Sequence, residues 1–506
     1  MSLLTARALG IILGTPLFSG LDLVIAKGDR VGLVAANGRG KSTLLRCLAG
    51  KSEPTSGEIT TARGLRIGLV TQDVPDDLLD KPLYDAVLSA LPDEQAEYES
   101  WRVDIALDDL SVPAELRSRP LGALSGGWQR VALLARTWVT EPDLLLVDEP
   151  TNHLDLSRIG LLQRWFETTA RDVPVLVASH DRAFLDAATN RTLFLRPETS
   201  RYFALPYSRA RDALEEADAA DARKFENDLR KADQLRRQAA KLKNIGINSG
   251  SDLLVNKTKQ LNERAEKLEE AARPAHQERS AGVIKLSNAG THAKALVALD
   301  DAEVTTPDGQ LLFKTGKIWI NRGDRVVVLG GNGTGKSQLL ERVAAAMTRD
   351  DADIRPAATA VLGHADQGLT NIDAFATPIE AITHSSDVGD QRARGLLAGA
   401  GMSIDLQSSK IAALSGGQRA RLAMLLLRLR TPNFYVLDEP TNHLDIDGQE
   451  MLEDELCEQG ASCLLVSHDR TFVRNVGTRF WEIRGKRLVE VEDPEPFFEA
   501  ALRAQS

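Results

Sequence analysis

One eight-residue segment occurs twice in this chain of 506 residues. Asp-Glu-Pro-Thr-Asn-His-Leu-Asp runs from Asp148 to Asp155 and again from Asp438 to Asp445. Each copy directly follows an apolar run that reads as a buried strand, Leu144–Val147 in the first half and Phe434–Leu437 in the second. The repeat predicts two copies of one α/β domain in a single chain, so the copies can pair without a second molecule.

A glycine-rich loop lies upstream of each copy, between a short apolar strand and a helix. Such a loop lets backbone N–H groups curl around phosphate oxygens, and the helix N-terminus adds a favourable dipole. The pattern predicts that the loop lysine reaches the β- and γ-phosphates and that the loop serine ligates Mg²⁺. Ala35 replaces the usual first glycine in the first loop, whereas the second loop is complete from Gly330. The predicted phosphate-binding residues are Asn37, Gly38, Gly40, Lys41, Ser42 and Thr43 in the first half, and Asn332, Gly333, Gly335, Lys336, Ser337 and Gln338 in the second.

The two carboxylates that open the repeated segment suit different tasks. Asp148 and Asp438 end their strands and suit Mg²⁺, either directly or through water. Glu149 and Glu439 come next and are placed to polarise an attacking water.

Three further signals keep the same order in both halves. Leu-Ser-Gly-Gly precedes a predicted helix, and its serine lies at the same distance from the glutamate in each half: 149 − 125 = 24 and 439 − 415 = 24. This helix start is a second anion-binding element, made of Ser125, Gly126 and Gly127 in the first half and of Ser415, Gly416 and Gly417 in the second. We call these the first and second signatures. Ser-His-Asp places His180 and His468 after later strands as candidate γ-phosphate contacts, and Gln72 and Gln367 follow earlier strands.

This order of motifs resembles the ATP-binding cassette superfamily, and the tandem arrangement with the repeated octapeptide resembles its ABC-F family. The resemblance covers nearly the whole chain. It implies an ATPase with ATP and Mg²⁺ as cofactors, Gln72 and Gln367 as further Mg²⁺ ligands, and two α/β P-loop cassettes that sandwich each ATP between the P-loop of one and the signature of the other. Many members of the family act on the ribosome, which they enter near the tRNA exit site.

By this resemblance each nucleotide site draws on both halves. The first site combines Lys41, Ser42, Gln72, Asp148, Glu149 and His180 with Ser415, Gly416 and Gly417. The second combines Lys336, Ser337, Gln367, Asp438, Glu439 and His468 with Ser125, Gly126 and Gly127. Neither half lacks its glutamate, histidine or signature serine, so both sites are predicted to hydrolyse ATP.

Two features depart from the common cassette pattern. Cassettes commonly stack adenine on an aromatic side chain upstream of the P-loop, but Gly10–Gly14 and Val304–Asp308 contain none. We therefore expect loose purine selectivity. Trp128 follows the first signature where Gln418 follows the second, and we interpret it as a packing residue.

Composition narrows the class of protein. No apolar run approaches the ~18 residues that a bilayer-spanning helix needs, and we expect no signal peptide. Cys47, Cys457 and Cys463 show neither metal-ligand spacing nor a disulfide framework, which predicts a cytoplasmic protein. A net charge of −10 argues against a broadly basic nucleic-acid surface, so any contact with RNA must be local.

The local basic surface lies between the halves. Residues 209–272 are rich in Ala, Glu, Lys, Arg and Leu with apolar positions at near-heptad spacing, which predicts an antiparallel helical hairpin that turns over residues 244–252. Two acids, Asp233 and Asp252, oppose eight basic residues between 229 and 260, a balance of 8 − 2 = +6. The basic residues are Arg230, Lys231, Arg236, Arg237, Lys241, Lys243, Lys257 and Lys259.

These observations predict cassettes at residues 1–205 and 281–506 joined by a hairpin linker at 206–280. We expect a monomer that pairs its own cassettes. By the resemblance to the ABC-F family, the expected partner is the ribosome, which the hairpin would contact through rRNA and the P-site tRNA. The alternatives are a hairpin that only spaces the cassettes, an ATPase subunit of a separate membrane transporter, and a DNA-directed ATPase. General translation, ribosome rescue and antibiotic-resistance ribosome protection stay open as the task.

Overall fold

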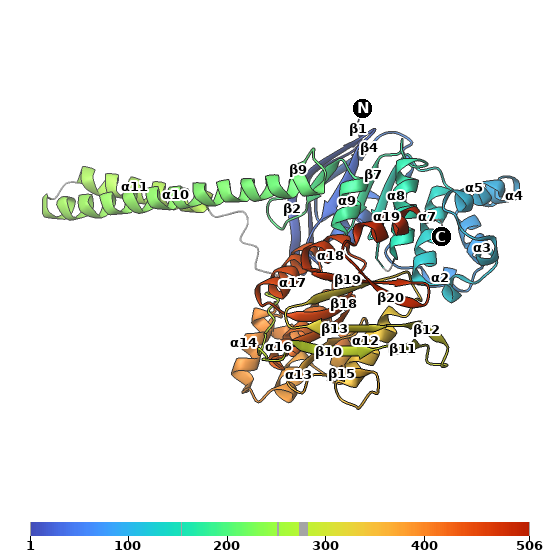
Figure 1. The fold of residues 1–506 in the computed structure, drawn as a ribbon. Helices are drawn as coiled ribbons and strands as arrows, with labels where there is room; N and C mark the ends of the chain where they lie inside the picture. Colours follow the sequence, from blue (N-terminus) through green and yellow to red (C-terminus); the bar gives the residue numbers. More distant parts are fainter. Residues whose placement is uncertain (1, 153, 250–251, 273–281, 505–506) are drawn as a thin grey trace.

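The computed structural model describes residues 2–152, 154–249, 252–272 and 282–504. Two α/β lobes lie against each other, and a long helical hairpin projects from them (Figure 1). The predicted fold class, two P-loop cassettes joined by a helical hairpin, is confirmed; the domain boundaries given above stay a prediction.

The first lobe is built on a six-stranded sheet with the order β5-β6-β7-β3-β8-β9. The strands from β5 to β8 in this order pair in parallel, and β9 is antiparallel. Parallel strands are covered on both faces, which explains the unbroken apolar runs that precede the motifs. The strands are β3 (Arg30–Val34), β5 (Ile67–Val70), β6 (Leu144–Asp148), β7 (Val175–Ala178), β8 (Arg191–Phe194) and β9 (Arg201–Phe203). A separate antiparallel sheet joins β1 (Ser2–Leu13), β2 (Thr15–Ala26) and β4 (Ser56–Thr61).

The helices of the first lobe fall into two groups. Those next to the main sheet are α1 (Lys41–Leu48), α7 (Gly126–Trp138), α8 (Leu156–Glu167) and α9 (Arg182–Ala188). A small helical region lies between β5 and α7 in the sequence and projects from the first lobe on the side opposite the hairpin (Figure 1). It contains α2 (Asp76–Leu79), α3 (Leu83–Leu88), α4 (Asp93–Tyr98), α5 (Trp101–Asp109) and α6 (Ala114–Arg117).

The second lobe repeats this plan with an eight-stranded sheet in the order β11-β12-β20-β19-β14-β18-β17-β16 and a three-stranded sheet in the order β13-β10-β15. Its strands are β10 (Ala295–Asp300), β11 (Glu303–Thr305), β12 (Leu311–Lys314), β13 (Lys317–Asn321), β14 (Arg325–Leu329), β15 (Ile354–Pro356), β16 (Leu362–Ala365), β17 (Phe434–Asp438), β18 (Ser462–Val466), β19 (Arg479–Arg484) and β20 (Arg487–Val491). Its helices are α12 (Lys336–Ala346), α13 (Pro378–Ser385), α14 (Asp390–Gly399), α15 (Ile404–Gln407), α16 (Gly416–Leu429), α17 (Ile446–Glu458), α18 (Arg470–Val476) and α19 (Glu495–Arg503).

The last helix ties the lobes together. Helix α19 packs against α8 of the first lobe, with Phe498 buried beneath it. Gly160 allows this approach, because a Cβ atom there would lie 2.2 Å from the carbonyl oxygen of Leu502. Arg164 of α8 also donates hydrogen bonds to the carbonyl oxygens of Leu502 and Ala504.

The hairpin consists of α10 (Tyr207–Ser249), with 43 residues, and α11 (Asp252–Ala272), with 21 residues. Its seam is lined by small side chains, since Ala232, Ala239 and Ala265 are buried, and this allows the helices to approach closely. The predicted turn over residues 244–252 is too wide. Helix continues through Gly246 to Ser249 and resumes at Asp252, because an isolated glycine weakens a helix without ending it. Residues 250–251 of that prediction lie outside the described part of the chain.

Within the described ranges, no helix combines the length and the apolar composition that a membrane span requires.

Candidate active sites between the two lobes

Each phosphate-binding loop has the backbone that the sequence predicts. Gly38 and Gly40 have φ angles of 76° and 89°, in the left-handed region that favours glycine, and α1 begins at the next residue, Lys41. Gly333 and Gly335 repeat this geometry ahead of Lys336.

The loop lysines are buried against their own loops. Lys41 Nζ donates a hydrogen bond to the Ala35 carbonyl at 3.0 Å, and Lys336 Nζ donates to the Gly330 carbonyl at 2.8 Å. Only a carbonyl is required at this position, which explains why alanine can replace glycine in the first loop. Burial lowers the pKa of Lys336, and the carboxylates of Glu439 and Asp438 oppose that shift.

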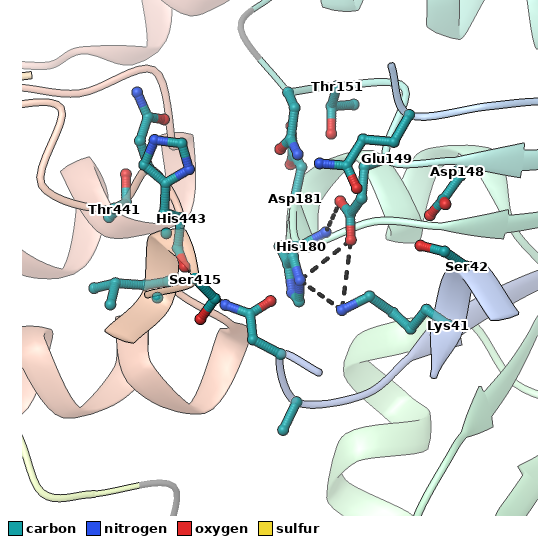
Figure 2. A pocket seen from close by; sticks show the side chains of 18 of the residues that line it. Lys41, Ser42, Asp148, Glu149, Thr151, His180, Asp181, Ser415, Thr441 and His443 are labelled. Atoms are coloured by element: carbon teal, nitrogen blue, oxygen red, sulfur yellow. Dashed lines mark hydrogen bonds and ion pairs between the residues drawn. The ribbon is translucent and has the colours of Figure 1, made fainter. Parts of the chain in front are cut away.

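A carboxylate and a hydroxyl come together at the end of each central strand. The Ser42 side chain lies beside Asp148 (Figure 2), and Ser337 is the corresponding neighbour of Asp438. Burial raises the pKa of both aspartates, and the neighbouring serine hydroxyl opposes that shift. Asp148 Oδ1 is buried and has no hydrogen-bond partner among the described residues. Oxygen donors of this kind fit Mg²⁺, which usually binds one or two carboxylates together with phosphate oxygens and water.

The glutamate after each aspartate has a strained backbone. Glu149 and Glu439 have φ angles of 48° and 50°, a region that non-glycine residues rarely adopt, and a proline follows each. Strain of this kind persists only where the surroundings hold it, and it clusters at functional sites.

Glu149 lies within a small charged cluster (Figure 2). Its Oε2 accepts the His180 backbone N–H at 3.2 Å, and its Oε1 lies 3.6 Å from Lys41 Nζ and 3.2 Å from His180 Nε2. Burial and the neighbouring Lys41 hold the pKa of His180 well below its usual range, so the ring is neutral and accepts a hydrogen bond from Lys41 at 2.7 Å. Burial raises the pKa of Glu149, and Lys41 opposes that shift.

The second glutamate has a similar environment. Glu439 Oε2 accepts the His468 backbone N–H at 3.1 Å, and its Oε1 lies 3.4 Å from His468 Nε2.

The loop of Lys41 touches the second lobe directly. Asn37 donates its backbone N–H to Asp445 Oδ2 at 2.9 Å and its side-chain N–H to the His443 carbonyl at 2.7 Å. The second signature is part of this contact, because a Cβ atom built on Gly417 would lie 2.7 Å from Asn37 Nδ2. Figure 2 shows Ser415 and His443 across the cavity from Lys41 and Glu149. The structure therefore brings together the residues of the first predicted site.

One cavity of about 750 Å³ contains the first predicted site and reaches part of the second. From the first site it is lined by Asn37, Gly38, Gly40, Lys41, Ser42, Thr43, Gln72, Asp148, Glu149, His180, Ser415, Gly416 and Gly417. From the second site it is lined by Asn332, Gln367, Glu439 and His468. The other predicted residues of the second site are not part of this lining: Gly333, Gly335, Lys336, Ser337, Gln338 and Asp438, and the first signature, Ser125, Gly126 and Gly127.

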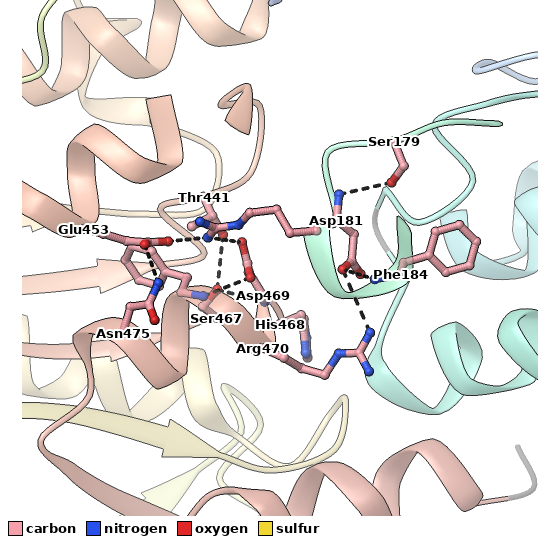
Figure 3. A network of polar contacts seen from close by, with 12 residues as sticks. Ser179, Asp181, Phe184, Thr441, Glu453, Ser467, His468, Asp469, Arg470 and Asn475 are labelled. Atoms are coloured by element: carbon pink, nitrogen blue, oxygen red, sulfur yellow. Dashed lines mark hydrogen bonds and ion pairs between the residues drawn. The ribbon is translucent and has the colours of Figure 1, made fainter. Parts of the chain in front are cut away.

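Sequence reasoning missed a set of ionic contacts that joins the lobes and includes the residues directly after the two histidines (Figure 3). Arg182, which follows His180 and Asp181, donates hydrogen bonds to Glu453 and, at 3.4 Å, to Asp469 Oδ2. In the reciprocal contact, Arg470 Nη2 lies 3.9 Å from Asp181 Oδ1. The sequence contained a signal for these contacts, because an arginine follows Ser-His-Asp in both halves. The repeat alone did not indicate that each arginine reaches the opposite lobe.

The wall beside the first loop is mostly aliphatic and contains no aromatic side chain among Leu13, Thr15 and Leu17. Leu13, Thr15 and Leu17 line the cavity, and Leu13 is 64% exposed although it is apolar. Trp128 is buried on its helix, as expected of a packing residue.

Comparison with known proteins agrees with the duplicated site. The family model described as "ABC transporter" matches residues 18–152 and 313–442. ATP-binding protein Uup of Caulobacter vibrioides is 31% identical, with 95% of this chain and 76% of that protein covered. ABC transporter F family member 5 of Arabidopsis thaliana is 29% identical, with coverages of 93% and 72%.

Solved structures show the same fold at lower identity. Archaeal ribosome recycling factor aABCE1, in complex with ribosomal stalk protein aP1, superposes with a TM-score of 0.66 at 19% identity, covering 98% of this chain and 92% of that one. A model of ribosome-bound archaeal Pelota and ABCE1 gives a TM-score of 0.62 at 20% identity, covering 98% of this chain and 80% of the matched chain.

Proposed function

This chain belongs to the ABC-F family of tandem ATP-binding cassette proteins and is an ATPase, and we propose that it acts on the ribosome, where closure of its cassettes around ATP positions the helical hairpin. The observation that carries closure of the cassettes is the contact of Asn37 with Asp445 and His443. It joins the phosphate-binding loop of one cassette to the signature region of the other within one chain.

In this proposal both nucleotide sites are composite. Lys41 and Lys336 bind the β- and γ-phosphates, and the opposite signature, Ser415 to Gly417 or Ser125 to Gly127, closes over them. Ser42 and Asp148 would hold Mg²⁺ in one site and Ser337 and Asp438 in the other, with Gln72 and Gln367 as further ligands. The ion would neutralise phosphate charge.

Glu149 and Glu439 orient the attacking water and accept its proton. Each lies beside the histidine of its own cassette, and Glu149 is also within reach of Lys41. His180 and His468 are assigned to the γ-phosphate. A neutral His180 suits this role, because its Nε2 can change from accepting the Lys41 N–H to donating to phosphate once its tautomer changes.

Closure follows from binding energy. Nucleotide contacts both cassettes only when they are together, so it favours the closed arrangement by its differential affinity. The base of α10 lies at the junction of the lobes, where Arg211 pairs with Asp447 and Glu450 of the second lobe. A change at this junction is carried along a helix of 43 residues, about 65 Å at 1.5 Å per residue.

The charges of the hairpin support RNA as the target of its distal part. About midway along α10, Arg230 pairs with Glu226 and Lys231 with Asp228, so those cations are partly compensated. Further along, Arg237, Lys241, Lys243, Lys257 and Lys259 are exposed. Exposed cations at the end of a projection from an acidic protein provide a local site for RNA phosphate.

Ribosome co-sedimentation tests the proposal. The variant with Glu149→Gln and Glu439→Gln should pellet with purified ribosomes in ATP and much less in ADP, because ATP stabilises the closed arrangement. The parent protein with non-hydrolysable ATP is the control. Equal pelleting with and without ATP, or none at all, would contradict the proposal, and nucleotide-dependent binding to membrane vesicles that carry a transporter would favour the transporter alternative.

A further inference from the structure

The last aspartate of the repeated octapeptide is held differently in the two cassettes. Asp445 Oδ2 accepts the Asn37 backbone N–H of the opposite cassette at 2.9 Å, with Arg421 Nη2 3.6 Å away. The same oxygen of Asp155 lies 3.3 Å from Arg158 Nη1, within its own cassette. In both cassettes Oδ1 accepts the N–H three residues along, from Gly448 or Arg158, and so caps the following helix.

A sequence exchange underlies this difference. The residue six positions after the signature serine is Arg421 in the second cassette and Val131 in the first (421 − 415 = 6; 131 − 125 = 6). The residue three positions after the aspartate is Gly448 in the second and Arg158 in the first (448 − 445 = 3; 158 − 155 = 3). Each cassette thus has one arginine beside this aspartate, but the two arginines come from different helices, α16 and α8.

Arg158 also covers the first signature. A Cβ atom built on Gly127 would lie 3.0 Å from Arg158 Cδ, whereas the corresponding face of Gly417 is met by Asn37 Nδ2 of the opposite cassette at 2.7 Å. The guanidinium carbon of Arg158 lies 4.8 Å from the centre of the Trp128 ring, in a cation–π contact. Gln418, at the Trp128 position of the second cassette, instead forms a capping box with Ser415.

We infer that Arg158, held on Trp128, occupies the place that the Asn332 loop takes when the Lys336 site closes. Arg158 covers one face of Gly127 and contacts Oδ2 of Asp155. In the other site, Asn37 makes the two equivalent contacts, with Gly417 and with Asp445. The Lys336 site therefore closes only after Arg158 leaves Gly127 and Asp155. The Lys41 site has no such requirement, because Gly448 has no side chain and Arg421 leaves the oxygen open to Asn37. Arg158 is a positioning residue that makes the two ATP sites unequal.

This inference rests on the composite sites proposed above and is independent of the ribosome. The test therefore uses the free protein and its ATPase activity, measured one site at a time. Glu149→Gln silences the Lys41 site and leaves the Lys336 site, and Glu439→Gln does the reverse. If ribosome binding fails while the results below hold, the proposed function is wrong and this inference stands.

The main variant is Arg158→Gly, which copies the second cassette. In the Glu149→Gln background, Arg158→Gly should lower the KM for ATP of the Lys336 site about fivefold. This factor corresponds to the net free energy of one hydrogen bond, the Arg158–Asp155 contact that no longer has to break. Ser157→Ala, a change at the preceding residue of α8, is the matched control and should leave KM within about twofold. Arg158→Gln retains helix propensity and side-chain length, so it should act in the same direction if glycine weakens α8.

The reciprocal variant is Gly448→Arg, made in the Glu439→Gln background, where it should raise the KM of the Lys41 site by a similar factor. Trp128 adds an optical signal, because removing a cation from its ring changes its fluorescence. Binding of ATP to the Glu149→Gln, Glu439→Gln protein should therefore change the emission, and Trp128→Phe should remove that change. An unchanged or raised KM in both Arg158→Gly and Arg158→Gln proteins that melt like their parent would overturn the inference. An emission change that persists in Trp128→Phe would also count against it.

Discussion

At the scale of single residues, the glutamates after β6 and β17 show how much of the site follows from sequence. Their position after an apolar strand and an aspartate suited to Mg²⁺ was enough to predict that they polarise the attacking water. Their left-handed backbone was not predictable, because a residue before proline usually adopts an extended conformation. The surrounding contacts, including the N–H of His180 and that of His468, hold each carboxylate in place.

Replacing both glutamates with glutamine should retain ATP binding and lower ATP turnover by about a hundredfold or more, since general-base assistance contributes factors of that size. Turnover measured by phosphate release and binding measured with radiolabelled ATP check the two parts. Parent-like turnover in the double variant would remove Glu149 and Glu439 from this role.

The wall beside the first loop, where the resemblance places the base, leads to a second prediction at this scale. The described wall beside the first loop consists of Leu13, Thr15 and Leu17, and an aliphatic surface contacts the face of any purine. GTP should therefore support turnover within about tenfold of ATP, a difference of ~1.4 kcal/mol. Steady-state kinetics with both nucleotides tests this prediction. A hundredfold preference for ATP would show that polar groups elsewhere in the site recognise the base.

At the scale of elements, the hairpin shows where sequence reasoning was strong and where it was not. The apolar spacing predicted two antiparallel helices, and the buried alanines confirm the seam. The charge count between residues 229 and 260 left out acidic residues outside those bounds, Glu226 and Asp228 on α10 and Glu269 on α11. Arg236, counted as free charge, pairs with Glu269 at 2.6 Å. The effective cationic region is therefore more distal than the count suggested.

Changing Lys241 and Lys243 to Glu should weaken ATP-dependent ribosome pelleting and make it less dependent on salt, because fewer counterions are released. Arg223→Glu with Lys224→Glu is the matched control: it makes the same change in net charge on the same helix, nearer the lobes. ATPase activity of the free protein should hold in both variants. If the control and the distal variant lose binding equally at every salt concentration, the distal hairpin does not contact RNA specifically.

At the scale of the whole molecule, the duplication predicted two cassettes in one chain, and the structure confirms this fold. Their closure on each other around ATP stays a prediction. Sequence could not predict that the two sites would be unequal. The motifs are almost the same in both halves, whereas the inequality comes from residues outside them, such as Arg158, Val131 and Arg421. The ionic contacts between Arg182, Asp469 and Glu453 escaped prediction for the same reason, because pairing across the lobes depends on their docking.

The central claim is that each nucleotide site is built from both cassettes. Vanadate-dependent photocleavage tests it directly, because vanadate trapped with ADP and Mg²⁺ at a site cuts the chain next to it under ultraviolet light. The Lys336→Ala variant confines trapping to the Lys41 site, and mass spectrometry locates the cuts. The account predicts cleavage within the Asn37–Ser42 loop and at Ser415, in the opposite cassette. Cleavage at the loop together with Ser125, or at the loop without any cut near Ser415, would contradict it.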